Sequence, residues 1–154
     1  MMKAVVDIET DSLDATKIHC IVAQHYQTGE TRQWVGDECS QFGGWSGKID
    51  QFIMHNGLSF DGPILNRLAN AKIKSHKIRD TLIESQLYNP VRDGGHSLAS
   101  WGERLDYTKG EFTEFEEYSE KMLEYCIRDT ELTRKLGVSL EQEGKIFSPM
   151  AYDL

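Results

Sequence analysis

Two carboxylates lie close to the start of the chain, at Asp7 and Glu9. In an extended strand successive side chains alternate between the two faces, so both acids point to one side while Val6 and Ile8 point to the other. Two acids on one face can share a divalent cation, whereas burying them without a partner is costly. The spacing is weak evidence by itself, because a second Asp-x-Glu occurs at 129–131.

A third carboxylate, Asp61, ends the segment 55–61, in which an apolar run leads through Gly57 into a helical pattern. Aspartate at the start of a helix commonly serves as an N-cap, and Pro63 stands where a first-turn proline is expected. The segment alone therefore leaves two interpretations open for Asp61, a helix cap or a metal ligand.

A fourth carboxylate, Asp129, follows Tyr125 by four positions inside a long helical pattern. This spacing places both side chains on one helix face, about one turn apart. Lys109 and Arg128 could meet phosphates nearby, but lone basic residues beside acids are usually solvated ion pairs, so we do not count them in the site.

The elements that must position these residues alternate between strand and helix patterns. Apolar alternation predicts strands over 3–9, 17–26 and 31–35, joined as an antiparallel meander with a turn at 28–30. A strand over 51–55, a helix through 64–69 and a short strand near 77–79 follow, and then helices at 82–87, 98–105 and 119–143. Glycine-rich stretches predict loops at 43–47 and 93–95. The order predicts an α/β fold with a mixed sheet.

Cysteine usage and composition exclude several classes of protein. Cys20, Cys39 and Cys126 are odd in number, lack a C-x-x-C spacing and sit in apolar surroundings, so we expect buried thiols instead of disulfides or a zinc site. Trp101 lies on an amphipathic pattern and is expected in the core. No apolar run approaches a bilayer span, and we expect a cytoplasmic protein with no membrane partner. The net charge of −8 argues against a broad basic patch for nucleic acid and fits a site that collects divalent cations, but many soluble proteins are acidic for solubility alone, so the charge by itself does not decide the function.

The three acidic segments together resemble the motifs of the DEDD exonuclease superfamily, in the order and spacing that this family uses. Segment 7–13 resembles the first exonuclease motif of family-A DNA polymerases nearly letter for letter, 55–61 resembles the second, and 125–129 the third. Segment 96–112 is similar to the exonuclease domain of phage replicative polymerases. Because Glu124 stands where the histidine branch would carry its histidine, the chain resembles the tyrosine branch.

This resemblance covers about residues 3–143 and implies a ribonuclease-H-like fold with a mixed five-stranded sheet flanked by helices. The chain is then one exonuclease domain over 1–154, with an unassigned tail at 145–154. It has no room for a polymerase domain, so we expect a free-standing enzyme or an excised domain.

The family's functional residues carry over to five positions of this chain. The resemblance implies that Asp7 bridges two divalent metals, that Glu9 and Asp129 complete the metal that activates water, and that Asp61 holds the second metal through its waters. Oxygen ligands favour Mg²⁺ or Mn²⁺ over zinc. Tyr125 would orient the attacking water.

Three further residues match positions that meet the substrate. Thr10 and Leu13 match family positions at the terminal nucleotide, with the leucine as a wedge between the last two bases, and Phe60 offers an aromatic face for stacking. Ordinary packing beside the first strand and helix is the alternative for all three.

The implied activity is a 3′→5′ exonuclease that releases 5′-mononucleotides from single-stranded or frayed DNA ends by two-metal hydrolysis. An RNA-processing exonuclease of the same branch remains an alternative, and so does a non-catalytic module that binds nucleic acid or a polymerase. A separate polymerase or another replisome component is a further expected partner. The motifs do not distinguish proofreading from degradation during phage replication.

Overall fold

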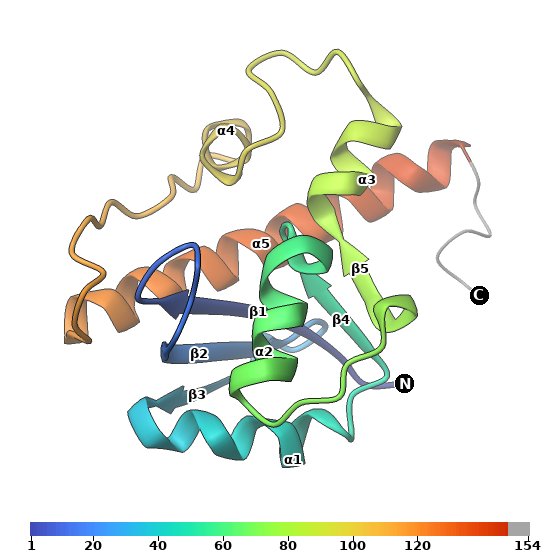
Figure 1. The fold of residues 1–154 in the computed structure, drawn as a ribbon. Coiled ribbons are helices and arrows are strands. Elements are labelled where there is room, and N and C mark those ends of the chain that lie inside the picture. The colour runs from blue at the N-terminus through green and yellow to red at the C-terminus, as the bar shows by residue number, and fades with distance from the viewer. Residues whose placement is uncertain (148–154) are drawn as a thin grey trace.

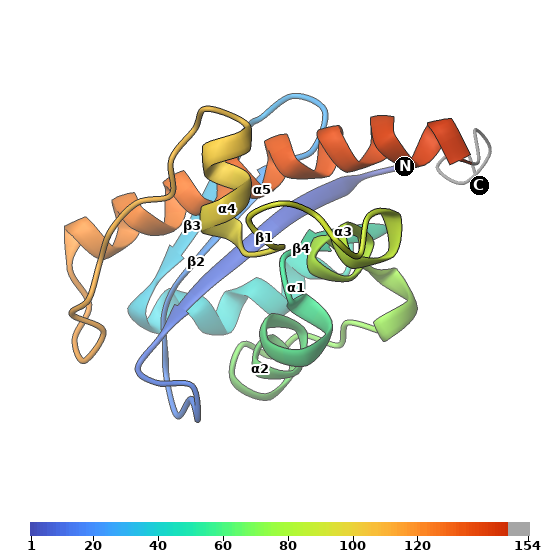
Figure 2. The ribbon, with the colours of Figure 1, turned by 90° about the horizontal axis from the view of Figure 1, so that it is seen from above.

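The computed structural model describes residues 1–147. Its centre is a five-stranded sheet with the strand order β3-β2-β1-β4-β5 (Figure 1). Helix α5 crosses one face of the sheet, and the short helices α1 and α2 lie on the other face (Figure 2). The α/β fold and the mixed five-stranded sheet flanked by helices are confirmed.

The first half of the sheet is an antiparallel meander. It consists of β1 (Lys3–Thr10), β2 (Ile18–His25) and β3 (Thr31–Val35). Strand β1 pairs with β2, and β2 pairs with β3, both antiparallel. The meander predicted from the apolar alternation is confirmed.

The second half of the sheet is parallel to β1. Strand β4 (Gln51–Met54) pairs with β1, and β5 (Ile78–Asp80) pairs with β4. Helix α2 (Gly62–Leu68) lies between the two strands in sequence, as a parallel crossover requires.

The remaining helices are α3 (Thr81–Tyr88), α4 (Leu98–Arg104) and α5 (Glu120–Phe147). They pack against one another, and α3 and α4 both contact α5. Apolar side chains of α5, including Met122 and Cys126, pack on Cys20 and Val22 of β2. The three predicted helices are confirmed, and the last one extends beyond the predicted end at 143.

The loop prediction at 43–47 was wrong. A 3₁₀ turn, η1 (Gly36–Gln41), leads into α1 (Phe42–Ser46). Phe42 is fully buried and packs edge-on against Trp34 at 5.0 Å between ring centroids. The glycines reflect close packing here: a Cβ on Gly43 would lie 2.0 Å from the carbonyl oxygen of Asn70. The loop predicted at 93–95 is confirmed.

Several smaller expectations can also be compared with the structure. Cys20, Cys39 and Cys126 are free and buried, and Trp101 is buried in the core, as predicted. Within residues 1–147 no helix combines the length and apolar character that a bilayer crossing needs. Positions 148–154 of the unassigned tail lie outside the described residues, and the single domain over 1–154 stays a prediction.

Candidate active site at the end of β1

The two acids of β1 face helix α5. Strand alternation places Val6 and Ile8 in the core on the opposite face, as predicted. Carboxylate oxygens of Asp7 and Glu9 and the Sγ of Cys126 all lie within 4.8 Å of one another. Burial raises the pKa of both carboxyls; the charge of Asp129 raises the pKa of Asp7 further, and that of Asp7 raises the pKa of Glu9.

Asp61 reaches the same site from a tight turn after β4. Asn56 adopts a left-handed conformation (φ 64°), and a one-turn π-helix, η2 (Gly57–Asp61), follows it. Gly57 is required because a Cβ there would lie 2.3 Å from the Cβ of Met54. Asp80, at the end of β5, holds this turn by accepting hydrogen bonds from the backbone N–H groups of Asn56 (2.9 Å) and Leu58 (3.1 Å).

The environment of Asp61 excludes the helix-cap interpretation that the sequence left open. Its side chain makes no capping hydrogen bond at the start of α2 and is only 4% exposed. Burial raises the pKa of Asp61 well above its usual value, and the charges of Asp7 and Asp80 raise it further. Asp61 is therefore a buried acid near Asp7, not a helix cap.

Asp129 and Tyr125 reach the site from α5, and Lys109 joins them. The ammonium group of Lys109 lies 3.1 Å from Oδ2 of Asp129 and also donates a hydrogen bond to the hydroxyl of Tyr125. Burial raises the pKa of Asp129, and the nearby Lys109 opposes that rise. Burial likewise raises the pKa of Tyr125, so the phenol keeps its proton at neutral pH.

Two residues of this site were not predicted from the sequence. Lys109 is half-buried and bonded to both Tyr125 and Asp129, so treating it as a solvated ion pair was wrong. Its position soon after helix α4 gave no signal of this contact. Asp80 positions the turn before Asp61, and its place directly after a short strand could have indicated a role at that edge of the sheet.

A hollow of about 390 Å³ adjoins the acids, and the three proposed substrate residues line it together with Glu9 and Phe115. Leu13 is 90% exposed, so core packing does not explain this leucine. Thr10 is buried, and its hydroxyl donates to the carbonyl of Ser12 at 2.8 Å, which holds the start of the loop that carries Leu13. Phe60 is half-buried and packs partly against the core.

The charge distribution of the site suits divalent cations. Burial raises the pKa of all four carboxyls, which come from three separate segments, and the charges of Asp7 and Asp129 add to this rise at neighbouring acids, so the ionised cluster is unfavourable without a counter-charge. One of them, Asp129, has a buried Oδ1 without a hydrogen-bond partner among the residues that the structure describes. Oxygen donors of this kind are those that Mg²⁺ and Mn²⁺ prefer, so the residues fit such ions.

Comparison with known proteins relates the chain to viral polymerases. No family model matches the sequence. The chain is 27% identical to the DNA-directed DNA polymerases of Escherichia phage T7 and Enterobacteria phage T3, over 94% of its own length in both cases. It spans 27% of each of these relatives.

Solved structures show the same fold. Phi29 DNA polymerase complexed with primer-template DNA superposes with a TM-score of 0.62 over 97% of this chain and 32% of that chain, at 12% identity. The complex of the same polymerase with single-stranded DNA gives a TM-score of 0.62 at 10% identity, again over 97% of this chain and 32% of that chain. The predicted ribonuclease-H-like fold is thereby confirmed, and the chain is related in sequence to one segment of phage DNA polymerases.

Proposed function

We propose that this chain is a divalent-metal-dependent 3′→5′ exonuclease that releases 5′-mononucleotides from single-stranded or frayed DNA ends. The observation that supports this function best is the convergence of four acids, carried by β1, η2 and α5, beside a hollow with an aromatic wall. A cation-dependent phosphodiester hydrolase needs neighbouring acids that bind cations. Burial and mutual repulsion destabilise these ionised acids, so a bound cation would stabilise them.

The acids would hold two Mg²⁺ or Mn²⁺ ions through Asp7, Glu9, Asp61 and Asp129. When bound, such a pair of ions supplies stabilisation of the entering and leaving oxygens of a phosphoryl displacement. Tyr125 keeps its phenolic proton and is held in place by Lys109, so its hydroxyl can orient a water molecule beside the acids.

The hollow beside Glu9 would receive the terminal nucleotide. Leu13 lies on its exposed rim and Phe60 on its wall, where a base could stack and be separated from its neighbour. The Thr10 hydroxyl donates to the Ser12 carbonyl, and this hydrogen bond would hold the protein backbone in place around the terminal nucleotide. An apolar wall has few groups that could distinguish one base from another, so we expect little sequence preference.

DNA is the proposed substrate because the T7 and T3 relatives are DNA polymerases and the Phi29 complexes contain primer-template or single-stranded DNA. The chain spans about a quarter of the T7 and T3 relatives. Because these relatives are DNA polymerases, we propose a separate polymerase or replisome component as a partner. We propose no membrane partner and place the activity in the cytoplasm of the phage host.

The test uses 5′-labelled DNA and RNA oligonucleotides of one sequence, incubated with Mg²⁺, Mn²⁺ or EDTA. We expect a ladder that shortens from the 3′ end of the DNA in either metal and no products in EDTA. Asp7→Ala should abolish the ladder, while Glu103→Gln, a change at an exposed acid on α4, should leave it intact.

Each other outcome has a distinct meaning. Faster shortening of RNA than of DNA would replace this proposal with an RNA-processing exonuclease. Absence of products from both oligonucleotides in both metals, with retained binding, would support a non-catalytic module and overturn the proposal.

A further inference from the structure

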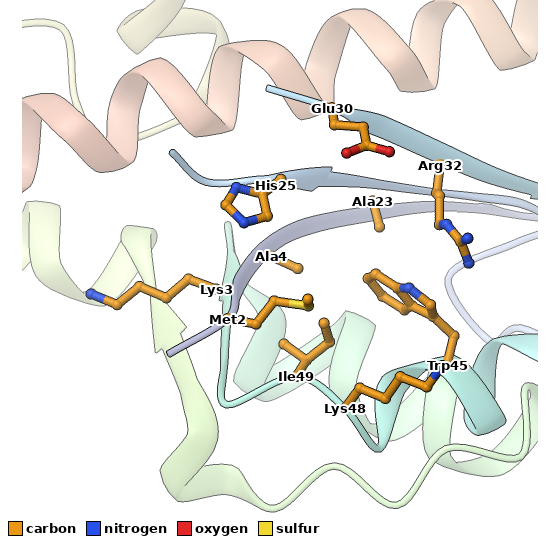
Figure 3. A pocket seen from close by; sticks show the side chains of 10 residues that line it. All are labelled: Met2, Lys3, Ala4, Ala23, His25, Glu30, Arg32, Trp45, Lys48 and Ile49. Carbon is orange, nitrogen blue, oxygen red and sulfur yellow. The ribbon is translucent and has the colours of Figure 1, made fainter. Parts of the chain in front are cut away.

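A second hollow lies on the face of the sheet opposite the acids, next to α1 (Figure 3). Its volume is about 280 Å³, just below the usual range for small-molecule sites. Ala4 and Ala23 line it from the sheet, and Trp45 and Ile49 line it from α1 and the segment that follows. This hollow, which we call the Trp45 pocket, is separate from the proposed active site.

The register of the strands explains why this pocket stays open. Ala4 pairs with His25 across β1 and β2, and Ala23 pairs with Arg32 across β2 and β3. Directly paired residues share a face of a sheet, so two small side chains form the floor and longer ones surround it. Trp45 is anchored on its other side by Trp34, with 5.0 Å between the ring centroids, which leaves a flat aromatic wall above an alanine floor.

Two cations flank the aromatic wall. Arg32 reaches from β3 toward the Trp45 ring (Figure 3). Lys48 lies in the turn after Trp45, and its backbone N–H donates to the Trp45 carbonyl at 3.1 Å. Both are exposed, and within residues 1–147 no hydrogen bond or ion pair is recorded for either side chain. Lys3 instead turns away from the pocket and lies 6.0 Å from the Tyr26 ring centroid.

One side of the pocket also carries polar groups. His25 and Glu30 line it at the turn between β2 and β3, where the Glu30 carboxylate lies between His25 and Arg32 (Figure 3), and the His25 N–H donates to the Glu30 carbonyl at 2.8 Å. A ligand that fits must therefore combine a flat apolar body, an anionic group that contacts the cations Arg32 and Lys48, and hydrogen-bond donors for the single carboxylate of Glu30. A protein with a net charge of −8 holds such an anion only where cations gather locally.

We propose that the Trp45 pocket binds a nucleoside monophosphate. The base stacks on Trp45 over the alanine floor, the phosphate contacts Arg32 and Lys48, and the Glu30 carboxylate accepts a hydrogen bond from a hydroxyl or amino group. Ala4 and Glu9 are five positions apart on β1, which corresponds to about 17 Å along an extended strand. The pocket therefore acts independently of the carboxylates and of any hydrolysis that they support.

The experiment follows the indole N–H signals of the three tryptophans by two-dimensional NMR. Deoxyadenosine monophosphate is titrated in EDTA, so that no metal recruits it to the acids. Trp45→Phe, which keeps an aromatic ring against Trp34, assigns the Trp45 signal. The Trp101 indole is buried and donates to Ser85 at 3.0 Å, so its signal is the internal reference.

We expect the Trp45 signal to shift with saturation at millimolar ligand while the Trp101 signal stays in place. Arg32→Ala combined with Lys48→Ala should weaken binding about tenfold, as expected for lost charge-assisted contacts. Lys74→Ala combined with Lys121→Ala removes the same charge from exposed positions outside the pocket and should leave binding unchanged.

Three results would overturn the proposal. The first is a Trp45 signal that does not move at about 10 mM ligand, which corresponds to no useful affinity. The second is an equal response to uncharged deoxyadenosine, and the third is equal weakening by both double variants, since either shows that Arg32 and Lys48 hold no phosphate.

Discussion

At the scale of single residues, the site is a balance between buried negative charges and one half-buried cation. Lys109 neutralises part of the charge at Asp129 and holds the Tyr125 hydroxyl, but Oδ1 of Asp129 remains without a partner among the described residues. The acids and the tyrosine thus have different tasks. A carboxylate would fix a cation, whereas the phenol only orients a water molecule.

This difference predicts different losses in two variants of α5. Asp129→Asn should lower the single-turnover rate by about 10³-fold or more, because a misplaced Lewis acid costs several kcal/mol. Tyr125→Phe should lower it by about 10²-fold and leave metal affinity unchanged. Single-turnover rates across a Mg²⁺ titration measure both effects. Equal losses in the two variants, or full rescue of Tyr125→Phe by excess Mg²⁺, would contradict a water-orienting role.

Lys109 provides a second prediction that does not depend on turnover. Its ammonium group occupies one oxygen of Asp129, so Lys109→Met should tighten Mn²⁺ binding several-fold by removing a competing positive charge. Calorimetric titration with Mn²⁺ measures the change. Lys121→Met, at an exposed lysine in the first turns of α5, is the matched control. Unchanged Mn²⁺ affinity in Lys109→Met would show that Lys109 does not compete with the metal.

His55 predicts how stability depends on pH. Burial lowers its pKa from 6.5 to about 4, against the opposing charge of Asp80, while the nearby His96 also contributes. The folded protein therefore binds fewer protons here than the unfolded chain, so the stability from this group is complete above pH 6.5 and is lost as the pH falls toward 4. In His55→Gln the free energy of unfolding, measured by urea unfolding, should change less between pH 6.5 and pH 4 than in the wild type. An unchanged pH dependence would show that His55 is not the group responsible.

At the scale of elements, two tight backbone approaches bring the segments together. The turn at Asn56 and Gly57 delivers Asp61 to the end of β1, and Asp80 holds that turn through backbone N–H groups. Helix α1 is pressed against the end of α2, where the Gly43 N–H donates to the Ala69 carbonyl at 3.0 Å. Both contacts need glycine because the opposing atoms leave no space for a Cβ.

The second contact predicts opposite outcomes for adjacent glycines. Gly43→Ala should reduce the free energy of unfolding by about 1–3 kcal/mol, because its Cβ would clash with the Asn70 backbone. Gly44→Ala, in the same helix with nothing within 4 Å of the added Cβ, should be neutral or slightly stabilising. Urea unfolding of both variants measures the difference. Equal changes in the free energy of unfolding would show that α1 can move away from α2 without a loss of stability.

At the scale of the whole molecule, the two faces of the sheet carry different chemistry. The acids lie toward α5 at one end of β1, and the Trp45 pocket lies toward α1 at the other end. This separation keeps anion-binding side chains away from clustered carboxylates, which would otherwise neutralise them. Without a bound cation, the clustered acids at the end of β1 lower the stability of the fold.

That cost predicts a link between metal and stability. Mn²⁺ at about 100 times its dissociation constant should stabilise the wild-type protein by about 2.7 kcal/mol. Asp7→Asn should be more stable than wild type in EDTA, because one buried negative charge is gone, and should gain little from Mn²⁺. Thermal unfolding with and without Mn²⁺ measures both, and Glu103→Gln should behave as wild type. Equal Mn²⁺ stabilisation of Asp7→Asn would remove Asp7 from the metal ligands.

The sequence by itself determined most of the elements and the identity of the candidate acids. Periodicity is a local property of the chain, so the strands of the meander, the two later strands and the long helix could be predicted from apolar spacing. The shared face of Asp7 and Glu9, and that of Tyr125 and Asp129, follow from strand and helix geometry alone. The motif order supplied Asp61, although a capping role could not be excluded locally.

Only the tertiary structure decided what depends on contacts between distant segments. The helix at 42–46 was missed because its glycines fit a close approach to residues 69 and 70, which no local pattern reveals. Lys109 and Asp80 joined the site for the same reason, since each acts on residues far away in the sequence. Burial, which raises the pKa of the acids and leaves Asp61 without a capping bond, is a property of the packed molecule. The sequence therefore determines which groups are available, and packing determines which of them meet.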